Sequence, residues 1–250
     1  MKSRKGKNRR QKQHRQAAPV EREAPSAGEL HTVAVWDLPT RLVHSALVLL
    51  LCLQILSGQF GLLPDIWHLW VGYALLVAVL FRLGWGLVGS ESARFGPMLA
   101  SLRGLPAYLP RLLSRQPTLW PGHNPVGALS SLLLIALLLG SAVSGLFIET
   151  WADYRGPLAE RVGRSTSIWF NDFHSVIRWP LYVLVSIHIL AALSYWLFKG
   201  EDRVRPIFRS GRLVLAEPAS FSFASSGRAI LVLIVSLAVV AGIVLFGPAA

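Results

Sequence analysis

Four histidines lie in apolar stretches of this chain, at positions that suit metal binding. His174 and His188 stand fourteen residues apart in one apolar run, and His44 and His68 open two others. In an α-helix, fourteen residues turn through about 1400° and rise about 21 Å, so both imidazoles project from one side of the helix at different depths. Histidine is costly in hydrocarbon and usually marks a functional site there. Two bis-histidine metal centres, stacked across a bilayer, would account for all four.

Composition indicates that these histidines belong to a membrane protein. Of 250 residues, 53% are hydrophobic and 15% are charged, with a mean hydropathy of +0.48, whereas soluble domains have about 25% charged residues. The single cysteine, Cys52, allows no intramolecular disulfide and no Cys-x-x-Cys-His motif, so any haem must be held non-covalently. The net charge of +12 comes from basic residues between apolar spans. Such residues orient membrane proteins, and we expect no nucleic-acid partner.

Five apolar runs approach the roughly 20 residues that a helix needs to cross a bilayer. They cover residues 42–62, 67–88, 126–148, 175–198 and 229–247. We therefore expect an all-α fold, a polytopic membrane helix bundle. The connection at 89–122 contains several prolines and is expected to form an amphipathic surface segment.

Basic residues in the connections predict the direction of each span. Nine Lys and Arg occur in residues 1–30, four Arg occur in the 89–122 loop, and the 199–228 segment is also basic. The 59–66 connection has no Lys or Arg. By the positive-inside rule, the N-terminus and the basic segments are cytoplasmic and the C-terminus is external. This orientation predicts a multi-pass membrane protein.

Orientation assigns each histidine to a side of the membrane. His44 begins the outward-running first span and lies on the cytoplasmic side, whereas His68 begins the inward-running second span on the external side. In the fourth span, which also runs inward, His174 is external and His188 is deeper toward the cytoplasm. We therefore expect two pairs, His68 with His174 and His44 with His188, in which the fourth helix serves both.

Two neutral imidazoles on facing helices form an axial ligand pair for haem iron. Zinc prefers four ligands, and no carboxylate lies beside these histidines in the spans. Two alternatives stay open: histidines that are merely hydrogen-bonded between helices, and a histidine-lined path for protons or ions. Small residues favour a planar cofactor between the helices, although simple helix packing explains them equally. These are Gly58, Gly72, Gly140, Gly145, Ser141 and Ser144.

Three arginines in or beside the spans require anionic partners. Arg178 follows His174 by one helical turn and therefore shares its face. Arg41 and Arg82 lie at the cytoplasmic ends of the first two spans. Each has two interpretations, a contact to a haem propionate or a side chain that extends to the lipid headgroups.

Two further residues lie close to this arrangement. His123 precedes Asn124 and Pro125, which together form a favourable helix start. We expect His123 to be a wet interfacial side chain, with a contact to a quinone headgroup or a propionate as the alternative. Pro180 falls between the two fourth-span histidines and is expected to kink that helix.

Several segments of the chain match known motifs in combination. They are VWDLPTRLVHSALVLL (35–50), FRLGWGLVGSESARFGP (81–97), GHNPVGALSSLLL (122–134) and the two histidines of the fourth span. Together they resemble the bacterial cytochrome b561 and Ni,Fe-hydrogenase b-type cytochrome family over about residues 33–212. The resemblance implies a four-helix core with two haem b groups, whose ligands map onto the same four histidines. The chain departs from the family at Ser45 and Ser175, where an aromatic residue and an acid are frequent.

The resemblance also implies a function and a division of the chain. It implies a location in the bacterial inner membrane, with the C-terminus periplasmic. It also implies electron transfer between membrane quinone and a redox partner protein, such as a c-type cytochrome or a hydrogenase-like subunit. The alternatives are a stand-alone oxidoreductase, for example a superoxide:quinone oxidoreductase, and an ion conduit. The lipid bilayer is an expected partner, and a homo- or hetero-oligomer is compatible with the sequence. The expected parts are a disordered basic cytoplasmic arm (1–32), a four-helix membrane domain (33–212), and a linker with an extra transmembrane helix (213–250).

Overall fold

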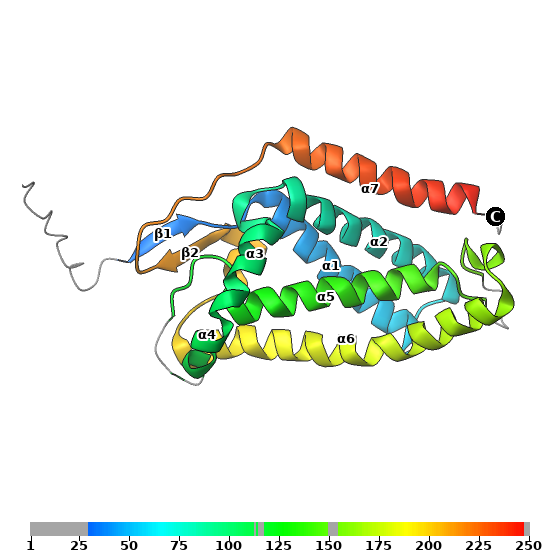
Figure 1. Cartoon of the computed structure of the whole chain (residues 1–250), viewed down its shortest axis with the longest axis horizontal. Helices are drawn as coiled ribbons and strands as arrows, with labels where there is room; N and C mark the ends of the chain where they lie inside the picture. The colour runs from blue at the N-terminus through cyan, green and yellow to red at the C-terminus, as the bar shows by residue number, and fades with distance from the viewer. Residues whose placement is uncertain (1–29, 113, 115–117, 150–154, 248–250) are drawn as a thin grey trace, which may run out of the picture.

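The structure is a computed structural model in which residues 30–112, 114, 118–149 and 155–247 are described. Four long helices run side by side and a fifth lies along one flank of the group (Figure 1). All five are long and apolar enough to cross a membrane, as expected. They are α1 (Leu38–Gly58), α2 (Asp65–Val88), α5 (Pro125–Gly145), α6 (Arg164–Lys199) and α7 (Ser226–Phe246).

Polar caps explain where two of these helices begin. The Asp37 carboxylate accepts a hydrogen bond from the backbone N–H of Thr40 at 2.8 Å, so α1 begins at Leu38, four residues before the apolar run. The Asn124 side chain accepts from the N–H of Gly127 at 2.7 Å, which confirms the predicted start of α5.

The fourth span departs most from the sequence prediction. Helix α6 begins at Arg164 rather than near residue 175, because its first four residues are polar and Asn171 and Asp172 interrupt the apolar residues that follow. It continues through Pro180 to Lys199, and Gly200, with a φ of 67°, caps its end. The proline therefore does not end the helix.

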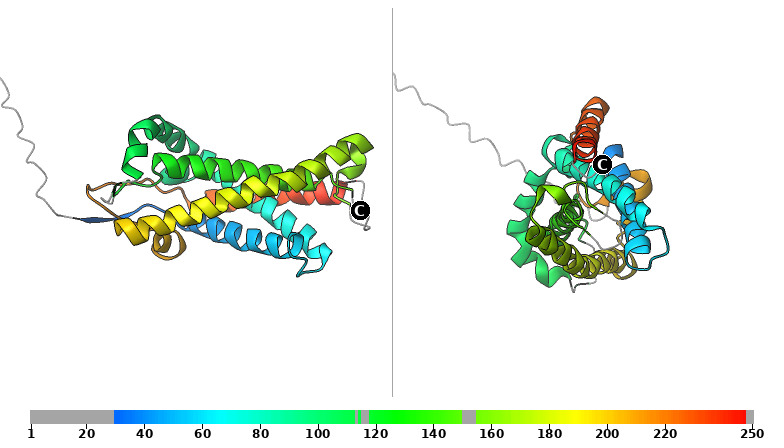
Figure 2. Two further views of the ribbon diagram at one scale, coloured as in Figure 1. Left: turned by 90° about the horizontal axis from the view of Figure 1, so that it is seen from below. Right: turned by 90° about the vertical axis from the view of Figure 1, so that its right-hand side faces the viewer.

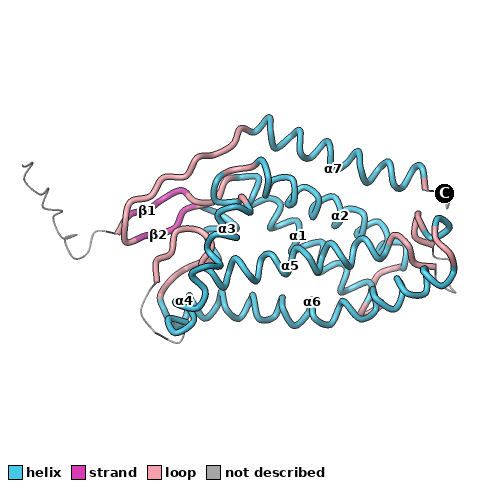
Figure 3. The backbone as a smooth tube through the Cα atoms, in the orientation of Figure 1, coloured by secondary structure: helices cyan, strands magenta, loops and turns pink. Residues whose placement is uncertain are grey.

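Two short strands mark one end of the bundle (Figure 3). Strand β1 (His31–Ala34) pairs antiparallel with β2 (Arg212–Leu215), and a short π-helix, η4 (Pro206–Ser210), precedes β2. We call this the sheet end, and the opposite end, which includes residues 146–149 and 155–163, the loop end. Strand β1 begins inside the segment expected to be disordered, while residues 1–29 of that arm lie outside the described residues.

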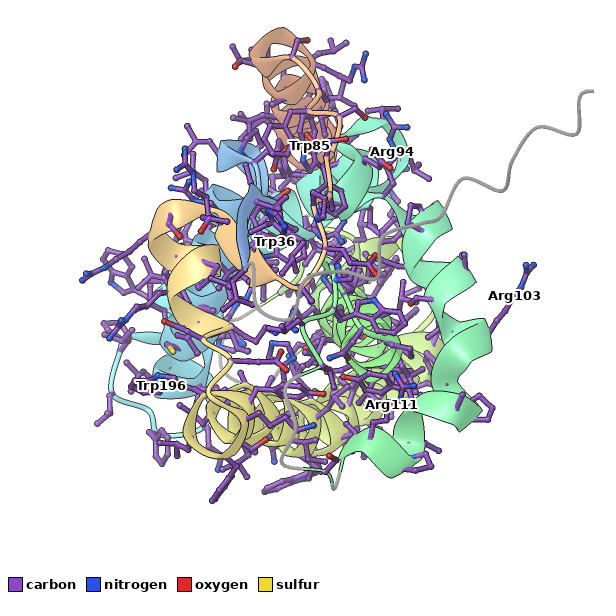
Figure 4. All side chains as sticks on the ribbon, turned by 90° about the vertical axis from the view of Figure 1, so that its left-hand side faces the viewer. Trp36, Trp85, Arg94, Arg103, Arg111 and Trp196 are labelled. Carbon is purple, nitrogen blue, oxygen red and sulfur yellow. The ribbon has the colours of Figure 1, made fainter. Side chains whose placement is uncertain are left out.

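The connection between α2 and α5 lies across the sheet end. It consists of short helices whose bounds are η1 (Glu91–Ala93), α3 (Phe95–Ser101), η2 (Leu102–Gly104) and α4 (Leu105–Leu112). Met98 and Tyr108 are buried whereas Leu99 and Leu109 are exposed, as expected of an amphipathic surface segment. Figure 4, viewed from this end, shows Arg103 of the connection pointing outward from the bundle.

A buried apolar layer occupies the middle of the four-helix group. Leu75 and Val79 of α2 pack there with Leu138 of α5 and Leu181 of α6. The end-on view in Figure 2 shows α1, α2, α5 and α6 arranged around a common centre with α7 outside them. Helix α7 packs against α2, where a Cβ on Gly84 would approach the Val232 side chain to 2.7 Å.

Candidate haem-binding sites

His68 of α2 and His174 of α6 face each other at the loop end. Their ring centroids are 6.3 Å apart and the ring planes are inclined by 83°. Bonds between imidazole nitrogen and a metal are about 2 Å long, so two rings that ligate one ion from opposite sides have centroids about 6 Å apart. The two histidines that the sequence paired at the external side are therefore close enough to share one ion.

Hydrogen-bond partners indicate which nitrogen of these rings carries the proton. His174 Nδ1 lies 2.9 Å from the carbonyl oxygen of Ser141, which can only accept, so His174 Nδ1 carries the proton and Nε2 has a free lone pair for a metal. The Ser57 hydroxyl lies 2.9 Å from the Leu53 carbonyl and 3.0 Å from His68 Nδ1. When Ser57 donates to the Leu53 carbonyl it accepts from His68 Nδ1, and His68 Nε2 is then likewise free.

A cavity of about 410 Å³ surrounds these two rings, within the usual size range of ligand sites. All four core helices line it, and Gly58, Gly72 and Gly145 supply small surfaces. A Cβ on Gly58 would come within 2.5 Å of His68 Cε1, so the ring occupies space that only glycine leaves open. Asp65 and Arg178 add opposite charges to the lining.

The other two histidines lie at the sheet end. His44 of α1 and His188 of α6 are near enough to interact electrostatically. His188 Nδ1 lies 3.1 Å from the hydroxyl oxygen of Ser130. His44 Nδ1 is buried and finds no hydrogen-bond partner among the described residues, and the Phe208 ring of η4 packs edge-on against the imidazole at 5.2 Å.

Each of the three sequence-predicted arginines keeps an unmet hydrogen-bond donor. Arg41 Nε, Arg82 Nη1 and Arg178 Nε are buried without a partner in the described part of the chain. Arg82 is 7% exposed, donates to the Met98 sulfur at 3.5 Å and stacks over the Phe95 ring at 5.1 Å. Buried cationic donors of this kind suit an anionic group such as a carboxylate.

His123 is less exposed than the wet interfacial side chain that we expected, since it is half-buried. The ring lies edge-on to Trp36 at 4.8 Å, and its Nδ1 is buried without a partner among the described residues. Burial, reinforced by the positive charge of Arg82, lowers the pKa of His123 to about 3. His123 is thus a neutral side chain that borders the sheet-end site.

The donor set fits axial ligands better than a free metal ion. In the described ranges, no three His, Cys, Asp or Glu side chains gather as a metal cluster, whereas a structural zinc ion takes four protein ligands. Two imidazoles on facing helices, small residues between them and arginines nearby suit a flat, anionic, iron-containing macrocycle.

Comparison with known proteins identifies the group of proteins to which this arrangement belongs. Residues 35–210 match the prokaryotic cytochrome b561 family. The chain belongs to this family. It is thus a b-type cytochrome of the bacterial membrane, with several membrane-spanning helices and a role in electron transfer.

The chain is also similar to a curated hydrogenase cytochrome subunit. A "Probable Ni/Fe-hydrogenase B-type cytochrome subunit" of Rhizobium leguminosarum bv. viciae is 26% identical over 216 residues, which cover 74% of this chain and 90% of the relative. No solved structure matches the chain at a significant level.

Sequence reasoning missed the serines that contact three of the four candidate histidines. The Ser144 hydroxyl lies 3.0 Å from His174 Nδ1, whereas the sequence indicates only that Ser144 is small, and Ser57 and Ser130 contact His68 and His188. Polar side chains are uncommon in apolar spans and often hydrogen-bond between helices, which was the available signal. Their partners could not be assigned without the helix packing.

Proposed function

We propose that the chain is a dihaem cytochrome that carries electrons across the inner membrane between the quinone pool and a redox partner protein. The observation that carries this proposal is the placement of two histidine pairs at opposite ends of one helix bundle. At the loop end, His68 and His174 would ligate one haem iron through Nε2. At the sheet end, His44 and His188 would ligate the second.

The surrounding residues would bind and orient the two groups. Arg178 would hold a propionate at the loop end, and Arg41 and Arg82 would do so at the sheet end, because each has a buried donor without a partner. When bound, each haem supplies an iron that takes up and releases one electron.

The apolar layer between the sites favours electron transfer over ion transport. Leu75, Val79, Leu138 and Leu181 are at most 6% exposed and offer no polar atom along the bundle centre. Protons and ions need such atoms or water to cross, whereas electrons do not. This layer would therefore block the movement of protons and ions between the two membrane sides, while electrons pass between the haems.

The relative supports the choice of partner class. The Rhizobium relative is named as a probable Ni/Fe-hydrogenase cytochrome subunit, so a hydrogenase-like protein is one candidate electron donor for this chain. A c-type cytochrome is the other, on the periplasmic side. Quinone would then exchange electrons with the sheet-end haem from within the membrane.

Single substitutions test both the haem count and the ligand pairing. We expect His68→Ala and His174→Ala to remove the same haem, and His44→Ala and His188→Ala to remove the other. The measurement is haem per chain, together with reduced-minus-oxidised spectra of the purified protein. His31→Ala, in strand β1, is the matched control and should retain both haems.

Two outcomes would contradict the proposal. Absence of b-type haem from the purified wild type would reject it entirely. Loss of one common haem from His68→Ala and His188→Ala, with the other retained, would reject the pairing.

A further inference from the structure

The four proposed ligand histidines differ in the number of hydrogen-bond acceptors that lie near their Nδ1 atoms. At the loop end there are three acceptors, the Ser57 hydroxyl for His68, and the Ser144 hydroxyl and Ser141 carbonyl for His174. At the sheet end, His188 has one candidate acceptor, the Ser130 hydroxyl. His44 has none among the described residues.

This difference bears on the iron because a histidine that donates from Nδ1 is a stronger base at Nε2. A more basic axial ligand stabilises the oxidised iron, which carries the greater positive charge. Hydrogen bonds around a haem are among the means by which a protein sets its potential. Three acceptors should therefore make the loop-end iron harder to reduce than the sheet-end iron.

Charged side chains near the two sites favour the same order of reduction potentials. At the loop end, Asp65 interacts electrostatically with His68 and offsets Arg178, which acts on His174. At the sheet end, the positive charge of Arg82 acts on His44, and Arg82 itself interacts with Asp37. A positive charge favours the reduced iron, so the sheet-end site should again have the higher potential.

We propose that these contacts set the two haem potentials apart, with the loop-end haem lower, and that Ser57, Ser144 and Ser130 are positioning residues that tune the irons through the histidines. One electron then passes from the reduced loop-end iron to the oxidised sheet-end iron, and no proton moves with it. This inference rests on the proposed dihaem function and adds a preferred direction, from the loop end to the sheet end.

A redox titration of the full-length protein, followed by haem absorbance, tests the role of the serines. Ser57→Ala and Ser144→Ala should each raise the lower potential and leave the higher one unchanged. The expected size is about a tenfold change in the ratio of reduced to oxidised haem, which is about 59 mV for one electron. Ser130→Ala should raise only the higher potential.

Matched controls separate the hydroxyl contact from a loss of packing. Ser194→Ala, in α6 outside both sites, removes a hydroxyl that donates to the Ala191 carbonyl. Ser45→Ala, beside His44, removes a hydroxyl that bonds the Arg41 carbonyl. Both should leave the two potentials in place, and Ser57→Thr, which keeps the hydroxyl, should restore the wild-type value.

The order of the potentials is measured independently of the serine variants. His44→Ala retains the loop-end haem and should titrate at the lower potential, whereas His68→Ala retains the sheet-end haem and should titrate at the higher one. The reverse order overturns the inference, as do serine variants that keep both haems and shift neither potential. If a serine variant loses haem, the order of the reduction potentials in His44→Ala and His68→Ala decides whether the inference stands. Wild type without haem would instead reject the proposed function on which the inference rests.

Discussion

At the scale of single residues, the loop-end site depends on very close approach between helices. The ring of His68 lies against the backbone of Gly58 in α1, where a Cβ would be 2.5 Å from Cε1 and 2.8 Å from Nδ1. Helix α1 supplies no ligand at this end. It nevertheless forms one wall of the site and places the Ser57 hydroxyl 3.0 Å from His68 Nδ1.

The first prediction concerns this glycine. Gly58→Ala should displace the His68 ring and lower the affinity for the loop-end haem about 10–100-fold, the range seen when support around a metal ligand is lost. The sheet-end haem should remain. Haem content and spectra measure the effect, and Gly242→Ala in α7, where a Cβ meets nothing within 4 Å, is the control. Full retention of both haems in Gly58→Ala would contradict the role given to this contact.

At the scale of elements, a buried carboxylate fixes the connection before α5 to the end of α6. Glu201 is 5% exposed and accepts hydrogen bonds from the backbone N–H and hydroxyl of Thr118 and from the guanidinium of Arg203. Burial by itself raises the pKa of Glu201, but the bonds from Arg203 and Thr118 outweigh it and hold the pKa below its usual value of 4.5.

The second prediction follows from this lowered pKa. Because the folded protein favours the charged form, Glu201 contributes stability above about pH 4.5, and that contribution is lost as the pH falls through the lower, folded-state pKa. Glu201→Gln should reduce the free energy of unfolding by about 1–3 kcal/mol at pH 7, since buried donors lose part of their acceptor. Its melting temperature should then fall less than that of the wild type between pH 7 and pH 3.

Thermal unfolding in detergent, followed by circular dichroism, measures this difference. Glu217→Gln is a matched control, because Glu217 is an exposed carboxylate in the linker before α7. Parallel pH curves for the wild type and Glu201→Gln would show that the carboxylate does not support the connection.

Helix α7 is an added element whose attachment is local. Its linker is held at the sheet end by bonds from the Ser222 N–H to Glu91 and from the Ala224 N–H to Ser90. Along its length α7 packs on α2, and it carries none of the proposed haem ligands. It therefore enlarges the surface of the molecule without entering the four-helix group that forms the sites.

At the scale of the whole molecule, the proposed function requires a defined orientation in the membrane. Basic side chains gather at the sheet end, where Figure 4 shows Arg94, Arg103 and Arg111. At the loop end, Arg155 is paired with both Glu149 and Glu160 at 2.7 Å. The positive-inside rule then predicts a cytoplasmic sheet end and a periplasmic loop end.

The third prediction tests this orientation by cysteine labelling in a Cys52→Ser background. Glu160→Cys, at the loop end, should react with a membrane-impermeant maleimide in intact cells whose outer membrane has been permeabilised. Glu217→Cys, in the linker at the sheet end, should react only after the inner membrane is opened. Both positions are exposed in the structure, so they form a matched pair. The opposite pattern would reverse the direction proposed for electron flow.

Much of the fold could be predicted from the sequence, because membrane spans and helix caps are encoded by short, continuous segments of the chain. Helix geometry fixes the rotation and rise between His174 and His188, and hydropathy locates five spans. Asn124 and Pro125 define the start of α5 through contacts within one turn. The start of α6 at Arg164 and the pairing of β1 with β2 were missed, because neither produces an apolar period.

The contacts that define the sites were decided only by the tertiary structure. Ser144 and His174 are separated by 30 residues, and Ser130 and His188 by 58, so each contact depends on how two helices pack. The same packing leaves the buried Nδ1 of His44 without a partner among the described residues. The sequence by itself determined that four histidines occupy two depths in a membrane bundle, because spacing and hydropathy are properties of the chain. Which nitrogen each histidine presents to its site, and which groups set the basicity of that nitrogen, depends on residues distant in sequence. Only the folded helices bring these residues together.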